Sequence, residues 1–267
     1  MRITAWLCFS ALAVPMAAPA QKPAPIEARV SRILVRMASP NVAARHAGLD
    51  DLIELISAGQ DLGFDPEYAD ALTAFLARHP AQADRIKLGL IKLLQADDDA
   101  VRDVKAAPGT YSEDDSEHYA QAIDLVASLN DERAIPALVG ALPTGGMATD
   151  GVLKYAGKAL GPVLARLHDP DPLMRSAPVS TAIAVWKQMN DAPSHARIRE
   201  MIRTSLADPA FTVRSSALWA IDGLDDAAEF VPALQAMAEH DPFTLPSESR
   251  YPLRDEAKQL LAKIASR

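Results

Sequence analysis

The sequence predicts an all-α protein built as an α-solenoid, a stack of antiparallel helix pairs. Three observations predict this class. Only 5% of the 267 residues are aromatic, and Ala and Leu dominate the apolar set, whereas β-sandwiches favour Val, Ile, Tyr and Phe. Apolar residues recur with a period near 3.6 along nearly the whole chain after residue 26. One short motif also returns at nearly constant spacing in the C-terminal half.

Composition excludes several classes of protein. With 49% hydrophobic and 23% charged residues, the chain is not disordered throughout. It has 27 basic and 35 acidic residues, for a net charge of −8, so we expect no nucleic-acid partner. Cys8 is the only cysteine, which leaves no pair for a disulfide and no thiolate metal site.

Residues 1–20 resemble a secretory signal peptide. Arg2 supplies the positive charge, residues 3–14 supply an apolar core, and Ala18-Pro19-Ala20 supplies the small-residue cleavage pattern. The core is too short to span a bilayer as a helix. We expect cleavage between Ala20 and Gln21, a periplasmic or secreted protein, and no membrane span in the mature chain.

The apolar period predicts one helix after another. Stripes at Ile26–Met37 and Leu49–Ile56 mark the first two helices. The other predicted helices cover residues 66–78, 81–96, 115–129, 132–142, 148–160, 162–168, 171–190, 194–207, 210–223, 226–239 and 249–266. Pro66, Pro136, Pro162 and Pro232 are expected at helix starts, where proline's missing N–H costs little.

The stretch 97–117 interrupts this pattern. It holds eight acidic residues and a Pro108-Gly109 turn signal. We interpret it as a solvated acidic connector, with cation binding left open. The predicted organisation, after the signal peptide, is a linker at 21–25, N-terminal helical repeats at 26–96, the connector, and C-terminal repeats at 118–267. Residues 143–149 and 242–252 are expected to be irregular.

The repeated motif is Asp or Ser, then Pro, four residues, and Arg. Its copies are Ser39-Pro40 with Arg45, Asp169-Pro170 with Arg175, Asp208-Pro209 with Arg214, and Asp241-Pro242 with Arg254. The last copy carries seven extra residues, and Asp97 with Arg102 is a possible degenerate copy. The three C-terminal arginines are 39 and 40 residues apart.

The physical chemistry of this motif is that of a structural repeat. Asp-Pro should cap and start the helix that carries the arginine. Apolar or small residues one before, three after and seven after each arginine lie on one helical face, as Val213, Ala217 and Ile221 do around Arg214. The arginine would then lie along the seam between units and reach an aspartate of a neighbour.

The segments LHDPDPLMRSAPVSTAI (167–183) and LADPAFTVRSSALWAIDGLDD (206–226) resemble HEAT repeats, particularly the short HEAT-like class of phycobilisome lyases. The resemblance covers about 160–265 and is more divergent over 26–160. It implies a right-handed, armadillo-type superhelix that serves mostly as a binding scaffold. Pro178, at a position usually held by a small helix former, departs from the pattern.

Motifs for catalysis are missing from the sequence. The six histidines are scattered without metal-ligand spacing, and no nucleophile-elbow, P-loop or dinucleotide motif occurs. Trp186 and Trp219 are expected mainly to pack in the core, with a contact on a binding face as the alternative. Arg29, Arg32, Arg36 and Arg45 are expected to form a solvated end-cap rather than an anion site.

These observations favour a monomeric, non-enzymatic, exported scaffold without cofactors that binds a protein on its concave surface. That surface is expected on the second helices of the pairs, assigned to 132–142, 162–168, 194–207 and 226–239. The alternative is a lyase-type accessory protein or a hydrolase subunit whose site is assembled from distant helices. A pocket that unites a histidine with two carboxylates would favour the alternative.

Overall fold

The computed structural model describes residues 25–57, 67–106, 113–245 and 250–266. Over these ranges the chain forms thirteen α-helices and four short 3₁₀ turns, with one isolated bridge between Leu245 and Arg250. The helices are α1 (Ile26–Met37), α2 (Val42–Ser57), α3 (Glu67–Arg78), α4 (Pro80–Ala106), α5 (Glu113–Ser128), α6 (Ile135–Ala141), α7 (Gly146–Leu153), α8 (Ala156–Ala165), α9 (Pro172–Gln188), α10 (Ala192–Leu206), α11 (Phe211–Asp222), α12 (Val231–His240) and α13 (Pro252–Ala265). The predicted all-α solenoid is confirmed, and the predicted signal peptide and its cleavage site lie outside the described residues.

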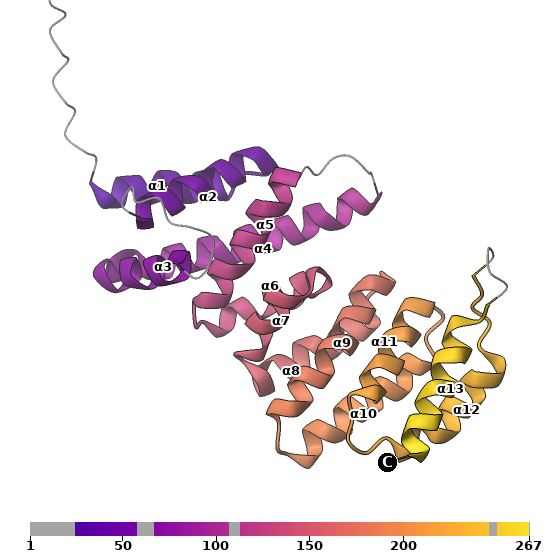
Figure 1. Ribbon diagram of the computed structural model, residues 1–267. Helices are drawn as coiled ribbons and strands as arrows, with labels where there is room; N and C mark the ends of the chain where they lie inside the picture. The colour runs from indigo at the N-terminus through magenta and orange to yellow at the C-terminus, as the bar shows by residue number, and fades with distance from the viewer. Residues whose placement is uncertain (1–24, 58–66, 107–112, 246–249, 267) are drawn as a thin grey trace, which may run out of the picture.

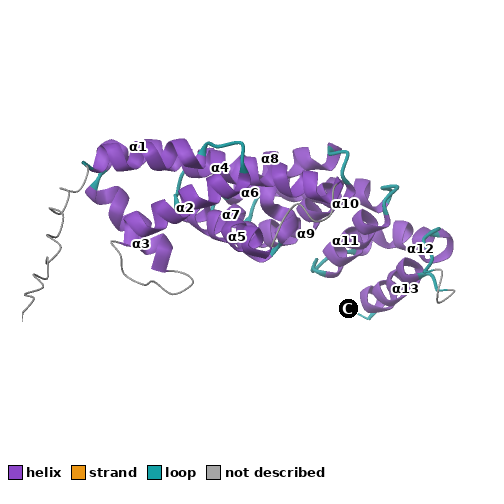
Figure 2. Cartoon of the chain, turned by 90° about the horizontal axis from the view of Figure 1, so that it is seen from above, coloured by secondary structure: helices purple, strands orange, loops and turns teal. Residues whose placement is uncertain are grey.

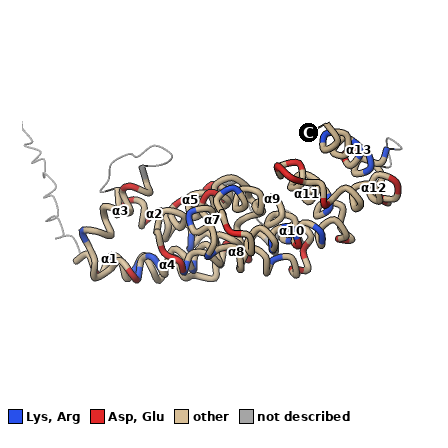
Figure 3. Tube along the Cα trace, turned by 90° about the horizontal axis from the view of Figure 1, so that it is seen from below, with Lys and Arg blue, Asp and Glu red and all other residues tan. Residues whose placement is uncertain are grey.

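The helices form two rows that run side by side along the molecule (Figure 1). One row holds α4, α6, α8, α10 and α12, and the other holds α5, α7, α9, α11 and α13 (Figure 2). Both ends of the array, at α3 and at α13, turn toward the side of the second row (Figures 2 and 3). The row of α5, α7, α9, α11 and α13 therefore forms the concave surface.

The structure corrects the expected pairing of helices. α10 packs against α11 and α12 packs against α13, while α11 makes no comparable contact with α12. The Asp-Pro turn therefore joins the two helices of one pair and does not begin a new pair. The segments assigned to the concave surface, 132–142, 162–168, 194–207 and 226–239, belong to the opposite row. A single copy of the motif cannot reveal on which side of the turn its partner helix lies.

The acidic stretch 97–117 is also different from the expectation. Residues 97–106 complete α4 and residues 113–117 open α5. Asp97 and Asp98 are buried, and each is hydrogen-bonded by a residue of another helix: Arg45 for Asp97 and Tyr119 for Asp98. The interpretation of these two acids as solvated loop charge is wrong.

Two clusters of buried apolar side chains hold the array together. The first extends from Val30 to Val163, and the second from Leu160 to Leu260. The clusters meet at α8, so the acidic stretch does not separate two cores. Burial of this continuous apolar face, shared between neighbouring pairs, is what stabilises stacked helices that could not fold alone.

One predicted helix is split and another starts earlier than expected. The chain leaves the helical path at Tyr155, so residues 148–160 belong to α7 and α8, and Pro162 lies inside α8 rather than at its start. The break is anchored because the buried Tyr155 hydroxyl accepts a hydrogen bond from the N–H of Asp131 at 2.8 Å. Periodicity alone does not reveal such a tertiary contact.

Candidate protein-binding surface

Arg175 connects two consecutive turns of the array. Its Nη1 donates to the carbonyls of Asp169 and Pro170 at 2.7 and 3.0 Å, in the turn that leads into its own helix. Its Nε and Nη2 donate to the two carboxylate oxygens of Asp208, in the next turn, at 2.8 and 3.0 Å. Such bidentate, charge-assisted pairs combine strength with a fixed geometry. We call this arrangement of an arginine, two carbonyls of its own turn and a distant aspartate an Arg–Asp joint.

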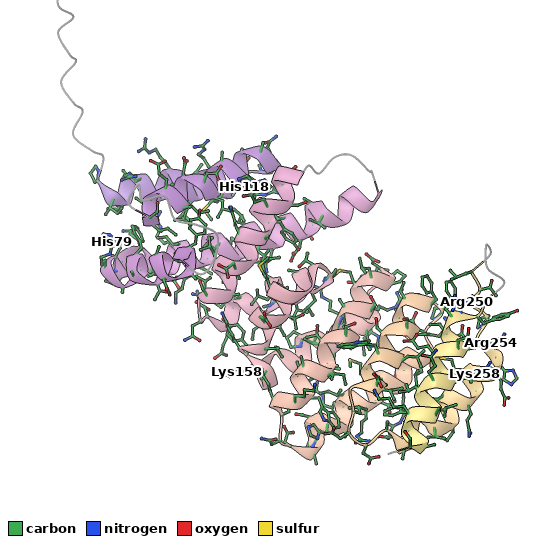
Figure 4. The ribbon with its side chains drawn as sticks, in the orientation of Figure 1. His79, His118, Lys158, Arg250, Arg254 and Lys258 are labelled. Carbon is green, nitrogen blue, oxygen red and sulfur yellow. The ribbon has the colours of Figure 1, made fainter. Side chains whose placement is uncertain are left out.

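Arg214 forms the next joint. Its Nη1 donates to the carbonyls of Asp208 and Pro209 at 2.8 and 2.9 Å, and its Nε and Nη2 donate to Asp241 at 2.7 and 3.1 Å. Arg254 follows with a hydrogen bond from Nε to the carbonyl of Asp241 at 2.7 Å. Figure 4 labels Arg254 at the C-terminal edge of the array, close to Arg250 and Lys258. These repeat residues hold successive turns together and do not form an open ligand site.

Asp208 does not cap α11 as the sequence suggested. The helix begins after Ala210 with no side-chain cap, and Asp208 accepts from the Ala210 N–H at 2.8 Å. Asp208 therefore shapes the turn and receives Arg175, whose hydrogen bond lowers the pKa of the Asp208 carboxyl. In the preceding unit, Asp171 caps α9 and accepts from the N–H of Leu173.

A related joint, in which one carboxylate oxygen accepts both bonds, lies in the N-terminal part. Arg45 donates to the carbonyls of Ser39 and Pro40 at 3.1 and 3.0 Å, and its Nε and Nη2 both donate to Asp97 Oδ1 at 2.9 and 2.7 Å. Asp97, the suspected degenerate copy, thus takes the place of the loop aspartate. Arg45 is buried, so its assignment to a solvated basic face is wrong. Arg36 of the same predicted face pairs with Asp51 at the surface.

A cluster of histidines and aspartates surrounds this N-terminal joint. His46 is buried with Nδ1 3.0 Å from Asp115 Oδ1 and Nε2 3.3 Å from Asp97 Oδ2. His46 Nε2 and Asp97 Oδ2 are not aligned for a hydrogen bond with each other, and neither atom has another hydrogen-bond partner. The ring of His46 stacks on His118 with centroids 4.6 Å apart, and His118 Nε2 lies 3.0 Å from Asp50 Oδ1. No local sequence pattern marks this cluster, because helix stacking brings together positions 46, 97 and 115.

The histidines do not gather into a metal site in the part of the chain that the structure describes, where no group of three or more His, Cys, Asp or Glu residues is arranged to hold an ion. His79 and His118, for example, lie at opposite ends of the N-terminal helices (Figure 4).

Three hollows follow one another along the concave surface. The first, about 330 Å³, lies over α5 and is mainly apolar, with Tyr119, Ile123 and Met147 among its lining residues. The second, about 420 Å³, lies between α7, α9 and α11 and is lined mostly by small residues, including Ala177, Ser180 and Ala184. The third, about 230 Å³, lies between α11 and α13. The concave surface can thus receive several side chains in succession.

Trp219 separates the second hollow from the third and lines both. Its side chain is 56% exposed, so the expectation that it packs in the core is wrong and the binding-face alternative describes its position. Its neighbours Leu218 and Ala220 are buried, which is why periodicity placed the indole inside. Trp186 is half-buried as expected and stacks on His195 with centroids 3.7 Å apart.

The third hollow, here called the Trp219 hollow, is lined by three charged side chains. Asp222 on α11 forms an ion pair with Lys263 on α13. Glu256 also lines the hollow, and partial burial followed by the nearby charge of Asp222 raises the pKa of its carboxyl. Gln259 completes the polar lining.

Comparison with known proteins adds little to this geometry. No family model and no curated protein matches the chain. One similar solved structure is a designed armadillo repeat protein in complex with the peptide (KR)4, with 18% identity, a TM-score of 0.42, and coverage of 88% of this chain and 99% of that one. The stacked helix pairs and the recurring Arg–Asp joints make this chain an all-α solenoid.

Proposed function

We propose that this chain is a non-enzymatic scaffold that binds an extended segment of a partner protein along its concave surface. The observation that carries the proposal is the exposed indole of Trp219 between two hollows. Tryptophan is enriched among the residues that contribute most of the binding energy of protein interfaces. In a helical repeat, the concave surface is the extended face offered to a partner.

The spacing of the hollows suits an extended chain. Neighbouring packed helices lie about 10 Å apart, and an extended chain advances about 3.3 Å per residue. Successive hollows lie about one and a half to two helices apart, so side chains about five residues apart in the partner would enter successive hollows. Met147, which is 40% exposed, gives the first hollow an apolar wall, so an apolar side chain suits that end.

The alternative is a lyase-type accessory protein or a hydrolase subunit, and it would require a catalytic cluster that a substrate can reach. His46 with Asp97 and Asp115 does unite a histidine with two carboxylates. However, His46 is only 3% exposed and lines none of the hollows on the concave surface. A catalytic base must reach the proton that it abstracts. We therefore assign this cluster to the joint that it surrounds.

We further propose that the protein is exported to the periplasm or secreted, on the basis of the signal-like residues 1–20. The amino terminus of the native protein should be Gln21. N-terminal sequencing that finds a cellular protein beginning at Met1 would refute export and leave the scaffold proposal untouched. Among the described helices, none is long and apolar enough to cross a membrane.

Site-specific photo-crosslinking tests the binding surface. A photoreactive amino acid at exposed Gln259, on the concave surface, should crosslink a partner, whereas one at exposed Arg197, on α10 of the opposite row, should not. With that partner purified, Trp219→Ala should weaken binding about tenfold or more, the range of an interface hot spot. Val35→Ala is the matched control, because Val35 is 75% exposed but lies on α1. Crosslinks from Arg197 alone, or equal binding by both variants, would refute the proposal.

A further inference from the structure

The Trp219 hollow places several charged side chains around an exposed indole. The first hollow is mainly apolar, and the second is lined mostly by small residues with one carboxylate, Asp150. The Trp219 hollow instead combines an exposed indole on α11 with two carboxylates, Asp222 and Glu256, and one ammonium group, Lys263. Its lining therefore carries an excess of one negative charge.

Glu256 is the carboxylate that carries this excess. Asp222 is already paired with Lys263, whereas no hydrogen bond or ion pair of Glu256 occurs among the residues that the structure describes. Glu256 is also half-buried, and its pKa is raised by burial and by the charge of Asp222. A half-buried carboxylate that lacks a partner is unfavourable unless a cation reaches it.

Trp219 provides the second element of a cation site. Asp222 lies one helical turn after Trp219, and Glu256, Gln259 and Lys263 share one face of the facing helix α13. An indole face attracts a guanidinium or ammonium group through its quadrupole, and it covers the aliphatic stem at the same time. The hollow thus offers an apolar wall for the stem and an unpaired carboxylate for the charge.

We infer that the Trp219 hollow is the specificity subsite for one cationic side chain, Arg or Lys, of the bound segment, with the stem across Trp219 and the charged group at Glu256. This inference rests on the proposed function, since it assigns one residue of the segment that the concave surface binds. The residue about five positions away enters the second hollow and is small, because Ala177, Ser180 and Ala184 line that hollow. Gln259 supplies a side-chain oxygen that accepts a further hydrogen bond from the cation.

Selection from a phage-displayed library of random 12-residue peptides tests the inference with the mature chain as bait. The parent protein should enrich peptides that share Arg or Lys at one fixed position. Glu256→Gln should remove the preference at that position while it retains the preferences at the others. Glu239→Gln is the matched control, because Glu239 is an exposed glutamate on α12, in the opposite row.

Calorimetry with one enriched peptide then measures how much the positive charge of the peptide contributes to the binding affinity. Replacing the selected Arg by citrulline, a neutral group of the same shape, should weaken binding to the parent about tenfold, as expected for a partly desolvated cation contact. Against Glu256→Gln the two peptides should bind within about twofold of each other. Equal binding of the two peptides to the parent overturns the inference.

The possible failures are distinguishable. Enriched peptides that lose binding on Trp219→Ala but show no fixed cation would refute the cation subsite and leave concave binding in place. Peptides that bind Trp219→Ala as tightly as the parent, or no enrichment at all, would refute the proposed function and the subsite with it. The denaturant midpoint of Glu256→Gln should be at or slightly above that of the parent, because burial raises the pKa of Glu256 and therefore favours a neutral side chain there.

Discussion

The N-terminal and C-terminal joints share the bonds to the arginine's own turn but differ in how the arginine bonds its aspartate. At the C-terminal end, Arg214 receives the carboxylate of Asp241 from a turn. At the N-terminal end, Arg45 receives the carboxylate of Asp97 from within the long helix α4. At both ends the arginine Nη1 donates to two carbonyls of its own turn. The constant part of the joint is thus the arginine with its turn, and any well-placed aspartate can complete it.

The two joints also differ in burial. The side chains of Arg45 and Asp97 are 4% and 0% exposed, and the second oxygen of Asp97 faces His46 without a hydrogen bond. Asp241 has an additional donor, the N–H of Phe243 at 2.9 Å. Loss of the arginine should therefore be more harmful at the N-terminal joint.

The largest effect is expected from Arg45→Ala. It leaves Asp97 charged and buried beside His46, and removal of one partner of a buried pair costs about 3–5 kcal/mol. Denaturant unfolding of the mature chain measures this loss. Arg32→Ala, an exposed arginine of α1, is the control and should change stability by less than about 0.5 kcal/mol. Similar midpoints for the two variants would show that the N-terminal joint does not contribute to folding.

Arg214→Ala should have the next largest effect, a loss of about 1–3 kcal/mol, the range for leaving a buried hydrogen-bonded group unsatisfied. Asp241 keeps its bond from Phe243 and lies near the turn, so the loss is smaller than at Asp97. Arg203→Ala is the control. The Arg203 side chain is 47% exposed in its ion pairs, so its loss should lower the free energy of unfolding by only about 0–1 kcal/mol. An unchanged midpoint for Arg214→Ala would move Arg214 from the structural residues to the binding residues.

Asp208→Asn should cost about 1–2 kcal/mol at neutral pH through the weakened bond from Arg175. The pKa of Asp208 is lowered in the folded state, so its contribution is present above the unfolded pKa of about 4. It is lost as the pH falls through the lowered folded value. Unfolding curves at several pH values should show the gap between parent and variant close below about pH 4. A gap that widens on acidification would contradict the pairing.

The smallest effect on stability is expected from Trp219→Ala, within about 0.5–1 kcal/mol of the parent, because more than half of the indole is already in water. Trp186→Ala should be clearly more destabilising, since Trp186 is half-buried and stacked on His195. Thermal melts of the two variants give the comparison. A larger loss for Trp219→Ala would return this residue to the core and remove it from the binding surface.

The sequence was sufficient for the fold class, because local periodicity and the spacing of Arg175, Arg214 and Arg254 encode the repeat directly. It was insufficient for Asp97 and Asp98. An acidic run resembles a solvated loop until partners from other helices neutralise it, and those partners are many residues away. The boundary between helical halves was misplaced for the same reason.

The candidate site was predicted only in kind. Any stack of helix pairs has a concave surface. Which helices form that surface depends on whether the Asp-Pro turn joins the two helices of one pair or connects one pair to the next. Trp219 was placed in the core because its two neighbours are buried, although a helix packed between two others still leaves one strip free. No sequence pattern marks Glu256 as a site residue, since its position opposite Trp219 arises only when α13 packs beside α11.

The series of joints also has a mechanical consequence. Arg175 ties the turn at Asp169 to that at Asp208, Arg214 ties Asp208 to Asp241, and Arg254 holds Asp241 again. These joints connect successive turns along one edge of the array. A partner that widens the concave surface would therefore separate the helices less at this edge than elsewhere. Force applied between the ends of the C-terminal pairs should be borne first by these ion pairs, and only afterwards by the apolar core.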